Sequence, residues 1–435
     1  MPKKKTALTI EERLQQALVP AEEQPYEVPE NWVWVRLGAI AEIVTGGTPS
    51  KKHPEYYGGN FPFYKPSDLD QGRLTYDASE YLSEEGKNVS RIIPKNSTAV
   101  CCIGSIGKCG YLMCEGTTNQ QINSAIPKIN SLCLYYYLCT ENFVQDLLSM
   151  ASATTIAIVN KSKMESCAFP LPPLSEQQRI VERIEELLAK LDEAKERLQE
   201  VADSFAVRKA AILHKAFTGE LTKQWRRENG VRDESWEEKK LSEITENQDS
   251  KRIPLSKSQR DNMNRIYDYY GASGIIDKVD DYIFEGKKLL IGEDGANLVT
   301  RSKDIAFIAD GKYWVNNHAH ILDVKDTVLL MYLCNYINNM DLIPYVTGSA
   351  QPKLTQAKMN NIKIFLPTLP EQHEIVRLID DLLARERAAQ QAAEQALASI
   401  DLMKKSVLAR AFRGELGTNK VSEASALELL RQVLS

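Results

Sequence analysis

The sequence predicts an α+β fold in which two β-rich domains are separated by an antiparallel coiled coil of two long helices. A motif repeat with constant spacing predicts the helices, and short apolar runs between turn residues predict the β-rich domains. The length of 435 residues also exceeds what one hydrophobic core usually serves. We therefore expect a pseudo-two-fold internal repeat, with one domain and one long helix in each copy.

Motifs in the first half of the chain return in the second half at a spacing of 195 residues. LPPLSEQQRIVERI begins at Leu171 and LPTLPEQHEIVRLI at Leu366, while AILHKAFTGELT begins at Ala211 and SVLARAFRGELG at Ser406. No insertion or deletion separates these motifs in either copy, although a surface loop would tolerate one. The repeated segment therefore has a constrained length, which favours a helix.

Apolar residues within the repeat recur at alternating steps of four and three, the pattern of helices that pair along one seam. A helix of roughly forty residues is about 60 Å long. Glu386 is an exception, because it falls where the first copy has Leu191, and alanines occupy the middle of the second seam. The predicted seam residues are Ile180, Ile184, Leu187, Leu191, Leu198, Val201 and Phe205 in the first copy, and Ile375, Ile379, Leu382, Ile400 and Val407 in the second.

Residues at the ends of both predicted helices are typical of helix caps. Ser175 with Gln178, and Thr368 with Glu371, predict capping boxes at the two starts. Gly219 and Gly414 follow the two helices, where a glycine ends a helix without strain.

Each copy also begins alike, because NWVWVRLGAI from Asn31 and SWEEKKLSEI from Ser235 share a Trp followed by Leu and Ile. The interiors of the two domains hardly match in sequence. Both contain short apolar runs, such as STAVCCIG from Ser97 and KKLLIGEDG from Lys287, and both end in helical segments. The predicted organisation is an N-terminal extension with a short amphipathic helix (1–30), a first domain (31–170), the first long helix (171–218), a linker (219–234), a second domain (235–365), the second long helix (366–413) and a C-terminal tail with a short helix (414–435).

Polar loops inside the two domains are the candidate binding elements. They combine Lys and Arg with Asn, Gln, Ser and Thr on glycine-containing backbone, which suits contacts with DNA phosphates and base edges. A solvated turn remains the alternative for any single one of these residues. The loops are 44–52, 64–69, 116–123 and 152–163 in the first domain, and 247–254, 269–275, 315–320 and 347–358 in the second.

The candidate DNA-binding residues share a side chain that can donate or accept a hydrogen bond, or a positive charge. In the first domain they are Thr45, Thr48, Ser50, Lys51, Lys52, Lys65, Ser67, Asn119, Gln120, Gln121, Thr154, Thr155, Asn160 and Lys161. In the second domain they are Lys251, Arg252, Tyr270, Ser273, Asn316, Asn317, His318, Ser349, Gln351 and Lys353.

Composition excludes several classes of protein. No apolar run is long enough for a membrane span, and the N-terminus lacks the apolar stretch of a secretion signal, so we expect a cytoplasmic protein. Seven of the eight cysteines lie between Cys101 and Cys167 without metal-ligand spacing, and we expect free thiols and no metal. His318 and His320 alternate on a predicted strand, where hydrogen bonding is the expected role. The net charge of −5 argues only mildly against a polyanionic partner.

Two segments of the sequence match catalytic motifs only weakly. NFPFY, from Asn60 to Tyr64, departs from the Asn-Pro-Pro-Tyr signature of adenine methyltransferases, because Phe61 stands where that signature has Pro. GSIGKCG, from Gly104, is too short for a phosphate-binding loop and has Cys109 in place of its Ser or Thr. The sequence therefore indicates a non-catalytic protein without a cofactor of its own.

The two long-helix motifs, their AFTGELT and AFRGELG ends, the Trp-led domain starts and the GSAQPKLTQ segment together resemble the specificity subunit of type I restriction-modification systems. The resemblance extends from about Trp32 to Leu416. The first domain departs from it, because ATTIAIVNKSK stands where the second domain has GSAQPKLTQ, so the two loops need not have equal roles.

The resemblance implies two target recognition domains that each read one half of a bipartite site in double-stranded DNA, with the helices as a spacer. It also implies two methyltransferase subunits, which carry S-adenosylmethionine, and two restriction subunits, which use ATP and Mg for translocation and cleavage. Two alternatives remain open: an enzyme that resembles a DNA adenine methyltransferase, and a coiled-coil scaffold for proteins only. The remaining apolar helix residues Val181, Leu188 and Ala202 either dock the methyltransferase subunits or complete contacts with the domains.

Overall fold

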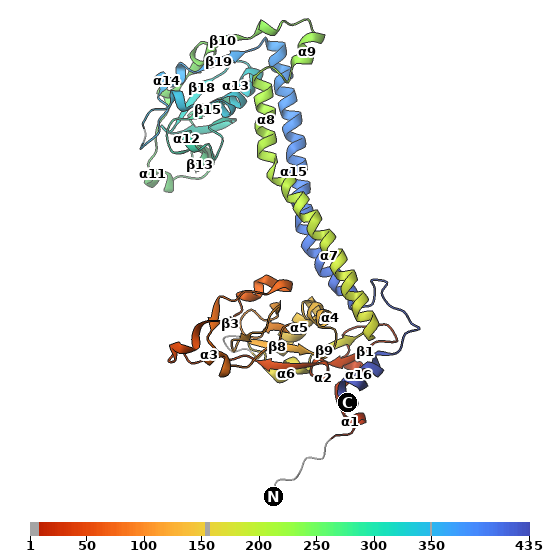
Figure 1. Ribbon diagram of the computed structural model, residues 1–435. Coiled ribbons are helices and arrows are strands. Elements are labelled where there is room, and N and C mark those ends of the chain that lie inside the picture. Colours follow the sequence, from red (N-terminus) through yellow and green to blue (C-terminus); the bar gives the residue numbers. More distant parts are fainter. Residues whose placement is uncertain (1–7, 153–156, 349) are drawn as a thin grey trace. The chain divides into compact units, whose positions relative to one another are not determined.

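The computed structural model describes residues 8–152, 157–348 and 350–435, with Asp233 described by its backbone alone (Figure 1). The chain divides into two compact units. The first unit consists of residues 1–198 and 396–435, and the second of residues 199–395. Each unit contains one β-rich domain and part of both long helices.

The first unit contains mixed elements in the order predicted for an α+β domain. Its strands are β1 (Val33–Arg36), β2 (Ala41–Thr45), β3 (Tyr57–Tyr64), β4 (Glu80–Leu82), β5 (Thr98–Cys101), β6 (Cys109–Tyr111), β7 (Thr117–Thr118), β8 (Ile122–Pro127) and β9 (Ala168–Leu171). Its helices are α1 (Ile10–Ala17), α2 (Leu37–Ile40), α3 (Glu84–Asn88), α4 (Ser131–Leu138), α5 (Glu141–Met150), α6 (Lys161–Ser166) and α16 (Ala426–Leu434), with 3-10 turns η1 (Ala21–Glu23), η2 (Pro54–Tyr56) and η3 (Asp68–Leu74).

The second unit also mixes strands and helices, and its β-rich domain begins with the second Trp-led segment. Its strands are β10 (Glu237–Lys240), β11 (Glu246–Asn247), β12 (Tyr267–Gly271), β13 (Gly274–Val279), β14 (Phe284–Glu285), β15 (Lys288–Gly292), β16 (Ala306–Ala309), β17 (Lys312–Val315), β18 (Ala319–Asp323) and β19 (Lys363–Leu366). Its helices are α8 (Phe205–Phe217), α9 (Lys223–Glu228), α10 (Leu241–Ile244), α11 (Lys257–Asp261), α12 (Asn297–Thr300), α13 (Thr327–Asn339) and α14 (Gln356–Asn360), with 3-10 turns η4 (Asp233–Ser235), η5 (Asp249–Lys251) and η6 (Ile343–Tyr345).

Both domains share one arrangement of sheets, to which the second domain adds the strand β14. In the first, one sheet has the order β2-β8-β5-β6, a second has the order β4-β3-β7, and β1 pairs with β9. In the second, the corresponding sheets are β11-β18-β15-β16, β13-β12-β17-β14 and β10-β19. Strand directions also agree, because β3 runs parallel to β7 just as β12 runs parallel to β17. The two domains therefore share one frame although their sequences have diverged, and their predicted β-rich character is confirmed.

The long helices are α7 (Leu174–Asp203) followed by α8, and α15 (Leu369–Ala411). In the first unit Lys195 forms an ion pair of 3.1 Å with Asp401, and Lys404 pairs with Asp192. Residues with higher numbers in α7 thus pair with residues with lower numbers in α15, so the two helices run antiparallel, as predicted. They lie side by side along their length within this unit (Figure 1).

In the second unit the helix pair continues as α8 and the first half of α15. Arg208 donates from Nε to the Glu386 carboxylate at 2.8 Å. This ion pair gives a reason for the acidic residue that interrupts the predicted apolar seam, because a guanidinium from the facing helix takes the place of an apolar contact. The predicted fold class, two β-rich domains with an antiparallel pair of long helices, is confirmed.

Two local predictions about the first long helix are wrong. The first long helix is interrupted at Ser204, whose N–H is shared between the carbonyls of Glu200 and Val201. Val201 lies exposed in the last turn before this interruption, so it is not buried in a seam. The other predicted seam residues are buried or half-buried.

Neither predicted capping box forms, because distant parts of the chain bind the side chains concerned. The N–H groups of Glu176 and Gln177 bond to the carbonyl of Pro173, while the Ser175 hydroxyl donates to Glu423 at 2.9 Å. At the second helix, Glu371 accepts its bonds from the segment that follows α8 rather than capping Thr368. Gly219 and Gly414 do adopt positive φ angles of 78° and 74° beyond the helix ends, as predicted.

The starts of the long helices belong to the domain cores. Val181 is buried in the core of the first domain, and Leu188 packs against it. This supports the second of the two roles expected for these residues, contact with the domain. The terminal helices α1 and α16 pack together, and Arg13 donates from Nη1 to the carbonyl of Leu434 at 2.8 Å. Within the described ranges, no helix is both long enough and apolar enough to span a membrane.

Candidate nucleic-acid interface

In the first domain the four predicted loops converge on residues 119–121, at the turn between β7 and β8. Gly46 and Gly47 bond from the first loop to the carbonyls of Ile122 and Thr118, at 2.9 and 2.8 Å. A side chain on Gly46 would overlap that turn, since a Cβ there would lie 2.2 Å from the Asn119 carbonyl oxygen. The backbone of the turn thus packs directly against the first loop, which requires glycine at position 46.

The other two loops of the first domain join the same turn. The Asn119 N–H donates to the carbonyl of Tyr64, the first residue of the second loop, at 3.1 Å. The Cys102 N–H donates to the Gln121 carbonyl at 2.7 Å, and the Cys102 carbonyl in turn accepts from Val159 at 2.9 Å. Segments that lie more than 100 residues apart in the sequence are therefore assembled at one end of the β2-β8-β5-β6 sheet.

The second domain assembles its four loops in the same way around the turn between β17 and β18. The Asn316 N–H donates to the Tyr270 carbonyl at 3.0 Å, just as Asn119 bonds Tyr64 in the first domain. Nε1 of Trp314, on β17, donates to the carbonyl of Ile253 at 2.6 Å, which attaches the loop 247–254 to the sheet. Glu293 donates from its N–H to His318, and its carbonyl accepts from Leu354.

Asn119 and Asn316 have equivalent internal roles in the two turns. They are only 7% and 4% exposed, and their Oδ1 atoms accept from the N–H of Gln121 at 3.1 Å and of His318 at 2.8 Å. Each asparagine thereby shapes a turn that leaves the next residue, Gln120 or Asn317, exposed. An exposed amide on a rigid turn is suited to bidentate hydrogen bonding with a base edge.

Exposure divides the candidate residues into three groups. Exposed side chains belong to Thr48, Ser50, Lys51, Lys52, Ser67, Gln120, Asn160, Lys161, Lys251, Ser273, Asn317, His318, Gln351 and Lys353. Half-buried or buried side chains belong to Thr45, Lys65, Asn119, Gln121, Arg252, Tyr270 and Asn316. Thr154, Thr155 and Ser349 lie outside the described residues.

Several candidate cations already have partners within their own domain. Lys65 pairs with Glu80 at 2.9 Å, and Lys353 pairs with Glu293 at 3.2 Å. Arg252 donates from Nη1 to Glu293 at 2.7 Å and to the carbonyl of Ala319 at 2.6 Å, which gives it a structural role. Among the described residues no ion pair forms to Lys51, Lys52 or Lys251, so these ammonium groups are the ones available for phosphates.

The loops 152–163 and 347–358, which differ in sequence, occupy equivalent places. Ile158 forms bridges to Ile103 and Ser152, and Lys353 forms bridges to Asp294 and Thr347 in the same pattern. The described residues that precede α6 (152 and 157–160) and α14 (347–348 and 350–355) are thus bridged to the sheet end, and we call each set the β-arm of its domain. Arg91, which the sequence did not suggest, reaches the same end of the first domain and donates to the Thr45 carbonyl at 2.6 Å. Nothing in its local pattern predicts this, because the contact joins segments 46 residues apart.

The residues of the weak catalytic matches have structural roles. Phe61 and Phe63 pack with Leu82 in a small core, and the Tyr64 hydroxyl donates to the Tyr76 carbonyl at 3.1 Å. All eight cysteines are free thiols, as predicted, and burial raises the pKa of Cys102 to about 12, which disfavours the reactive thiolate. Among the described residues no group of three or more His, Cys, Asp or Glu side chains is arranged to hold a metal ion.

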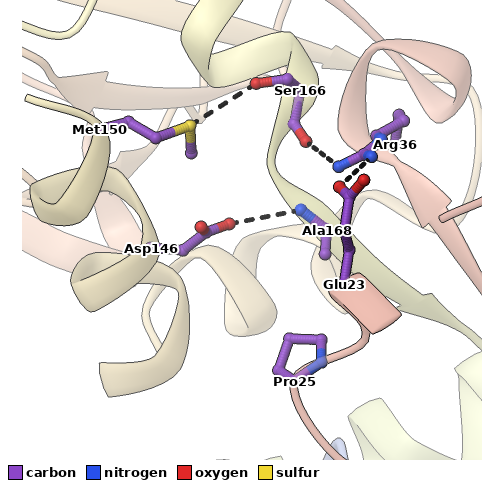
Figure 2. Close-up of a pocket in the computed structure, with 7 residues that line it drawn as sticks. All are labelled: Glu23, Pro25, Arg36, Asp146, Met150, Ser166 and Ala168. Carbon is purple, nitrogen blue, oxygen red and sulfur yellow. Dashed lines mark hydrogen bonds and ion pairs between the residues drawn. The ribbon is translucent and has the colours of Figure 1, made fainter. Parts of the chain in front are cut away.

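One cavity of about 430 Å³ lies in the first unit, and no candidate DNA-binding residue lines it. Figure 2 shows Arg36 directed toward Glu23 and the Ser166 carbonyl, and Asp146 directed toward the Ala168 N–H. Burial raises the pKa of Asp146, although the Ala168 N–H partly offsets this. These polar groups attach the N-terminal segment to the domain, and no nucleophile and base stand paired there.

Comparisons with known proteins agree with the repeated frame. The E. coli EcoDI specificity subunit is 25% identical over 424 residues, with 90% of each chain covered. Three other type I specificity subunits, from Haemophilus influenzae and E. coli, are 32–40% identical, but the matched segments span only 37–40% of their length.

Solved structures share the fold. The HsdS subunit from Thermoanaerobacter tengcongensis superposes with a TM-score of 0.64 at 18% identity, over 90% of this chain and 99% of that one. A chain from a type I R-M system, solved in a study of complex assembly, superposes with a TM-score of 0.65 at 17% identity, over 90% of this chain and all of that one. The family model of the type I restriction modification DNA specificity domain matches residues 29–203 and 233–396. With most of both domains and long helices matched, the chain belongs to the type I restriction modification DNA specificity family.

Proposed function

We propose that this chain supplies the DNA sequence specificity of a type I restriction-modification complex, a bacterial defence system. Each domain reads one half of a split site in double-stranded DNA through its four converging loops. The observation that carries the proposal is that one sheet frame occurs twice and presents different exposed side chains at the same place. A shared frame fixes how each domain docks, and its divergent loops allow the two half-sites to differ.

The long helices set the gap between the half-sites in this proposal. Antiparallel pairing is fixed by charged contacts such as Lys195–Asp401 in the first unit and Arg208–Glu386 in the second. Sliding one helix against the other would separate these pairs and expose apolar seam residues. A helix pair of constant register therefore suits a site whose two halves are separated by a constant number of base pairs.

Catalysis and cofactors belong to partner subunits in this proposal. Two methyltransferase subunits would carry S-adenosylmethionine, and two restriction subunits would use ATP and Mg. The chain itself would act in the cytoplasm as the subunit that recognises the DNA sequence and holds the other subunits together, without a catalytic residue or cofactor of its own. The internal roles of the Asn60–Tyr64 residues support this division, because Phe61 and Phe63 fill a core rather than line a cofactor site.

The test is retention of DNA by the chain assembled with its methyltransferase partner. Sequencing the methylated sites in cells that carry the complete system first defines the split site. The complex should then bind that duplex at least about 10³-fold more tightly than a scrambled duplex at the same salt concentration. Equal binding of both would reject the proposal and favour a scaffold for proteins only. Calorimetry that detected S-adenosylmethionine binding to the isolated chain would favour an enzyme instead.

A further inference from the structure

One polar residue on the central strand holds the β-arm in each domain, but its chemistry differs between the two. Asn123 on β8 stands opposite Thr45 at the end of β2. His320 on β18 stands opposite Asp249, in the turn that continues β11. Asn123 is 2% exposed and His320 1% exposed, so water cannot substitute for their partners.

Both residues bridge the same two elements. Asn123 accepts from the Thr45 hydroxyl at 2.7 Å, and its Nδ2 lies 3.4 Å from the Val159 carbonyl oxygen. His320 Nδ1 lies 2.5 Å from the Asp249 carboxylate, and Nε2 lies 2.7 Å from the Leu354 carbonyl oxygen. Val159 and Leu354 are equivalent, because each directly precedes the residue that caps α6 or α14. Each bridge therefore attaches a β-arm to the central strand.

The second bridge needs a proton that the first does not. A carbonyl oxygen only accepts hydrogen bonds, so Nε2 of His320 must donate to Leu354. Asp249 also accepts from the N–H of Ile321 at 2.9 Å, as an ionised carboxylate does. Burial opposes that charge, yet the hydrogen bond and charge of His320 hold the pKa of Asp249 below its ordinary value. When Asp249 is ionised, Nδ1 of His320 donates to it as well, and a ring that donates from both nitrogens is an imidazolium.

The charges around His320 fit a cation. A carboxylate oxygen of Glu293, which follows β15, lies 3.8 Å from Nδ1 of His320. The same carboxylate forms ion pairs with Arg252 and Lys353. Arg252 approaches Asp249 as well, at 3.5 Å. Two carboxylates thus lie near Nδ1 of His320, and the two cations contact these carboxylates. Removing the proton from Nδ1 would leave a neutral nitrogen lone pair facing the buried carboxylate of Asp249. Around Asn123 the bridging groups are a hydroxyl and an amide, which keep their hydrogens across the same pH range.

We propose that His320, in its imidazolium form, is a positioning residue that holds the arm segment Gln351–Leu354 for reading the second domain's half-site, so that recognition of this half-site alone weakens as pH rises. The inference rests on the proposed function. The direction of the pH effect follows from the number of N–H donors on the ring. The protonated ring donates to both Asp249 and Leu354, and the neutral ring loses one of these two hydrogen bonds. The carboxyl of Asp249 stays ionised on the alkaline side, so it does not reverse this trend.

The first measurement is made on the complex with its methyltransferase partner, from about pH 5.5 to about pH 9, a window that brackets histidine titration. Binding of the methylated-site duplex is compared with binding of duplexes altered in one half-site or the other. We expect discrimination at one half-site to fall roughly tenfold with rising pH, about the effect of one charge-assisted hydrogen bond, while the other stays constant. Equal pH dependence at both half-sites, or none, overturns the inference.

The two domains provide matched variants. Asp249→Thr with His320→Asn installs the first domain's neutral pair and should abolish the pH dependence. Thr45→Asp with Asn123→His installs the charged pair in the first domain and should create pH dependence at the other half-site. A pH dependence that persists unchanged in the first variant contradicts the role of His320.

A second measurement separates this inference from the proposed function and needs neither DNA nor a partner subunit. Histidine-labelled NMR without DNA follows His320, assigned by loss of its signal in His320→Asn, together with hydrogen exchange of Gln351–Leu354. We expect deprotonation of His320 and loss of protection in the arm to coincide. If no specific DNA binding exists but the two coincide, the proposed function fails and the positioning role stands. If the arm stays protected while His320 titrates, the positioning role fails whatever the DNA result.

Discussion

Nε1 of Trp32 donates a hydrogen bond of 2.7 Å to the carboxylate of Glu176, and both side chains are buried. Thr418 and Asn419 donate to the same carboxylate at 3.1 and 2.8 Å. One carboxylate therefore joins the start of the first domain, the start of the long helix and the C-terminal tail. The Glu of the repeated Glu-Gln pair therefore has a structural role at this junction.

Glu371 has the equivalent place in the second unit but a different set of donors. It accepts from the Thr222 hydroxyl and from Nη1 of Arg226, both at 2.7 Å. Arg226 is 6% exposed and Glu371 fully buried, so the second junction contains a buried ion pair where the first contains neutral donors. Breaking a buried ion pair costs more than losing a neutral hydrogen bond.

Glu371→Gln should therefore lower the free energy of unfolding more than Glu176→Gln does. We expect a loss of about 3 to 5 kcal/mol for Glu371→Gln, because a buried guanidinium loses its carboxylate, and about 1 to 3 kcal/mol for Glu176→Gln. Urea denaturation of the full chain measures both. Glu182→Gln, on the exposed face of α7, serves as the control and should change the value by less than about 0.5 kcal/mol. Equal losses at the two junctions would contradict the distinction.

Shortening both long helices together should shorten the gap in the DNA site. Residues 192–198 face residues 398–404, as the Asp192–Lys404 and Lys195–Asp401 pairs indicate. Deleting both heptads keeps the seam in register and removes about 10 Å of helix, or roughly three base pairs of DNA. Mapping the methylated sites should show a gap smaller by that amount. Deleting one heptad alone should instead prevent the two long helices from pairing. An unchanged gap between the half-sites, in a fully assembled complex with both deletions, would contradict the role of the helices as a spacer.

Replacing Lys51 and Lys52 by Gln should weaken binding to specific and scrambled DNA alike. The two ammonium groups are exposed and have no ion pair among the described residues, so we expect them to neutralise phosphates. The slope of log affinity against log salt should become shallower by about 2. Lys190→Gln, on the surface of α7 and paired with Glu186, is the control and should leave the slope unchanged. A loss confined to the specific duplex would assign these lysines to base reading instead.

Gln120→Ala and Asn317→Ala should each relax recognition of a different half-site. Both residues are exposed on equivalent turns that buried asparagines hold in place. We expect each variant to lose about 1 to 3 kcal/mol of discrimination at one base position and none at the other half-site. Binding to a panel of single-base changes measures this. If both variants affected the same half-site, the equivalence of the two turns would be wrong.

The repeat and its helices were predictable because they depend on local patterns. The heptad steps of Ile180, Ile184, Ile375 and Ile379 specify which face of each helix is apolar. All four are buried within the core clusters of the domains, and their contact along a helix seam stays a prediction. Gly219 and similar glycines mark the helix ends through a backbone conformation that other residues rarely adopt. The loops were recognisable by their mixture of amides, hydroxyls and cations, and which of their residues touch DNA stays a prediction.

The two capping boxes do not form because contacts with distant residues compete with local hydrogen bonds. Ser175 has the right spacing to cap α7, but its hydroxyl bonds Glu423, which lies 248 residues further along the chain. A local pattern does not include such a competitor. The same holds for Arg252, which reads as a surface cation in sequence and donates inward to Glu293.

By itself, the sequence determined the two-fold repeat, the long helices and the β-rich domains, because periodic burial and backbone preferences act over a few residues. Only the tertiary structure decided that unlike loops share one sheet frame and that Asn123 and His320 bridge the same elements. It also decided which cations remain unpaired. Those outcomes depend on partners brought together from distant segments, where hydrogen bonds and charges compete for burial.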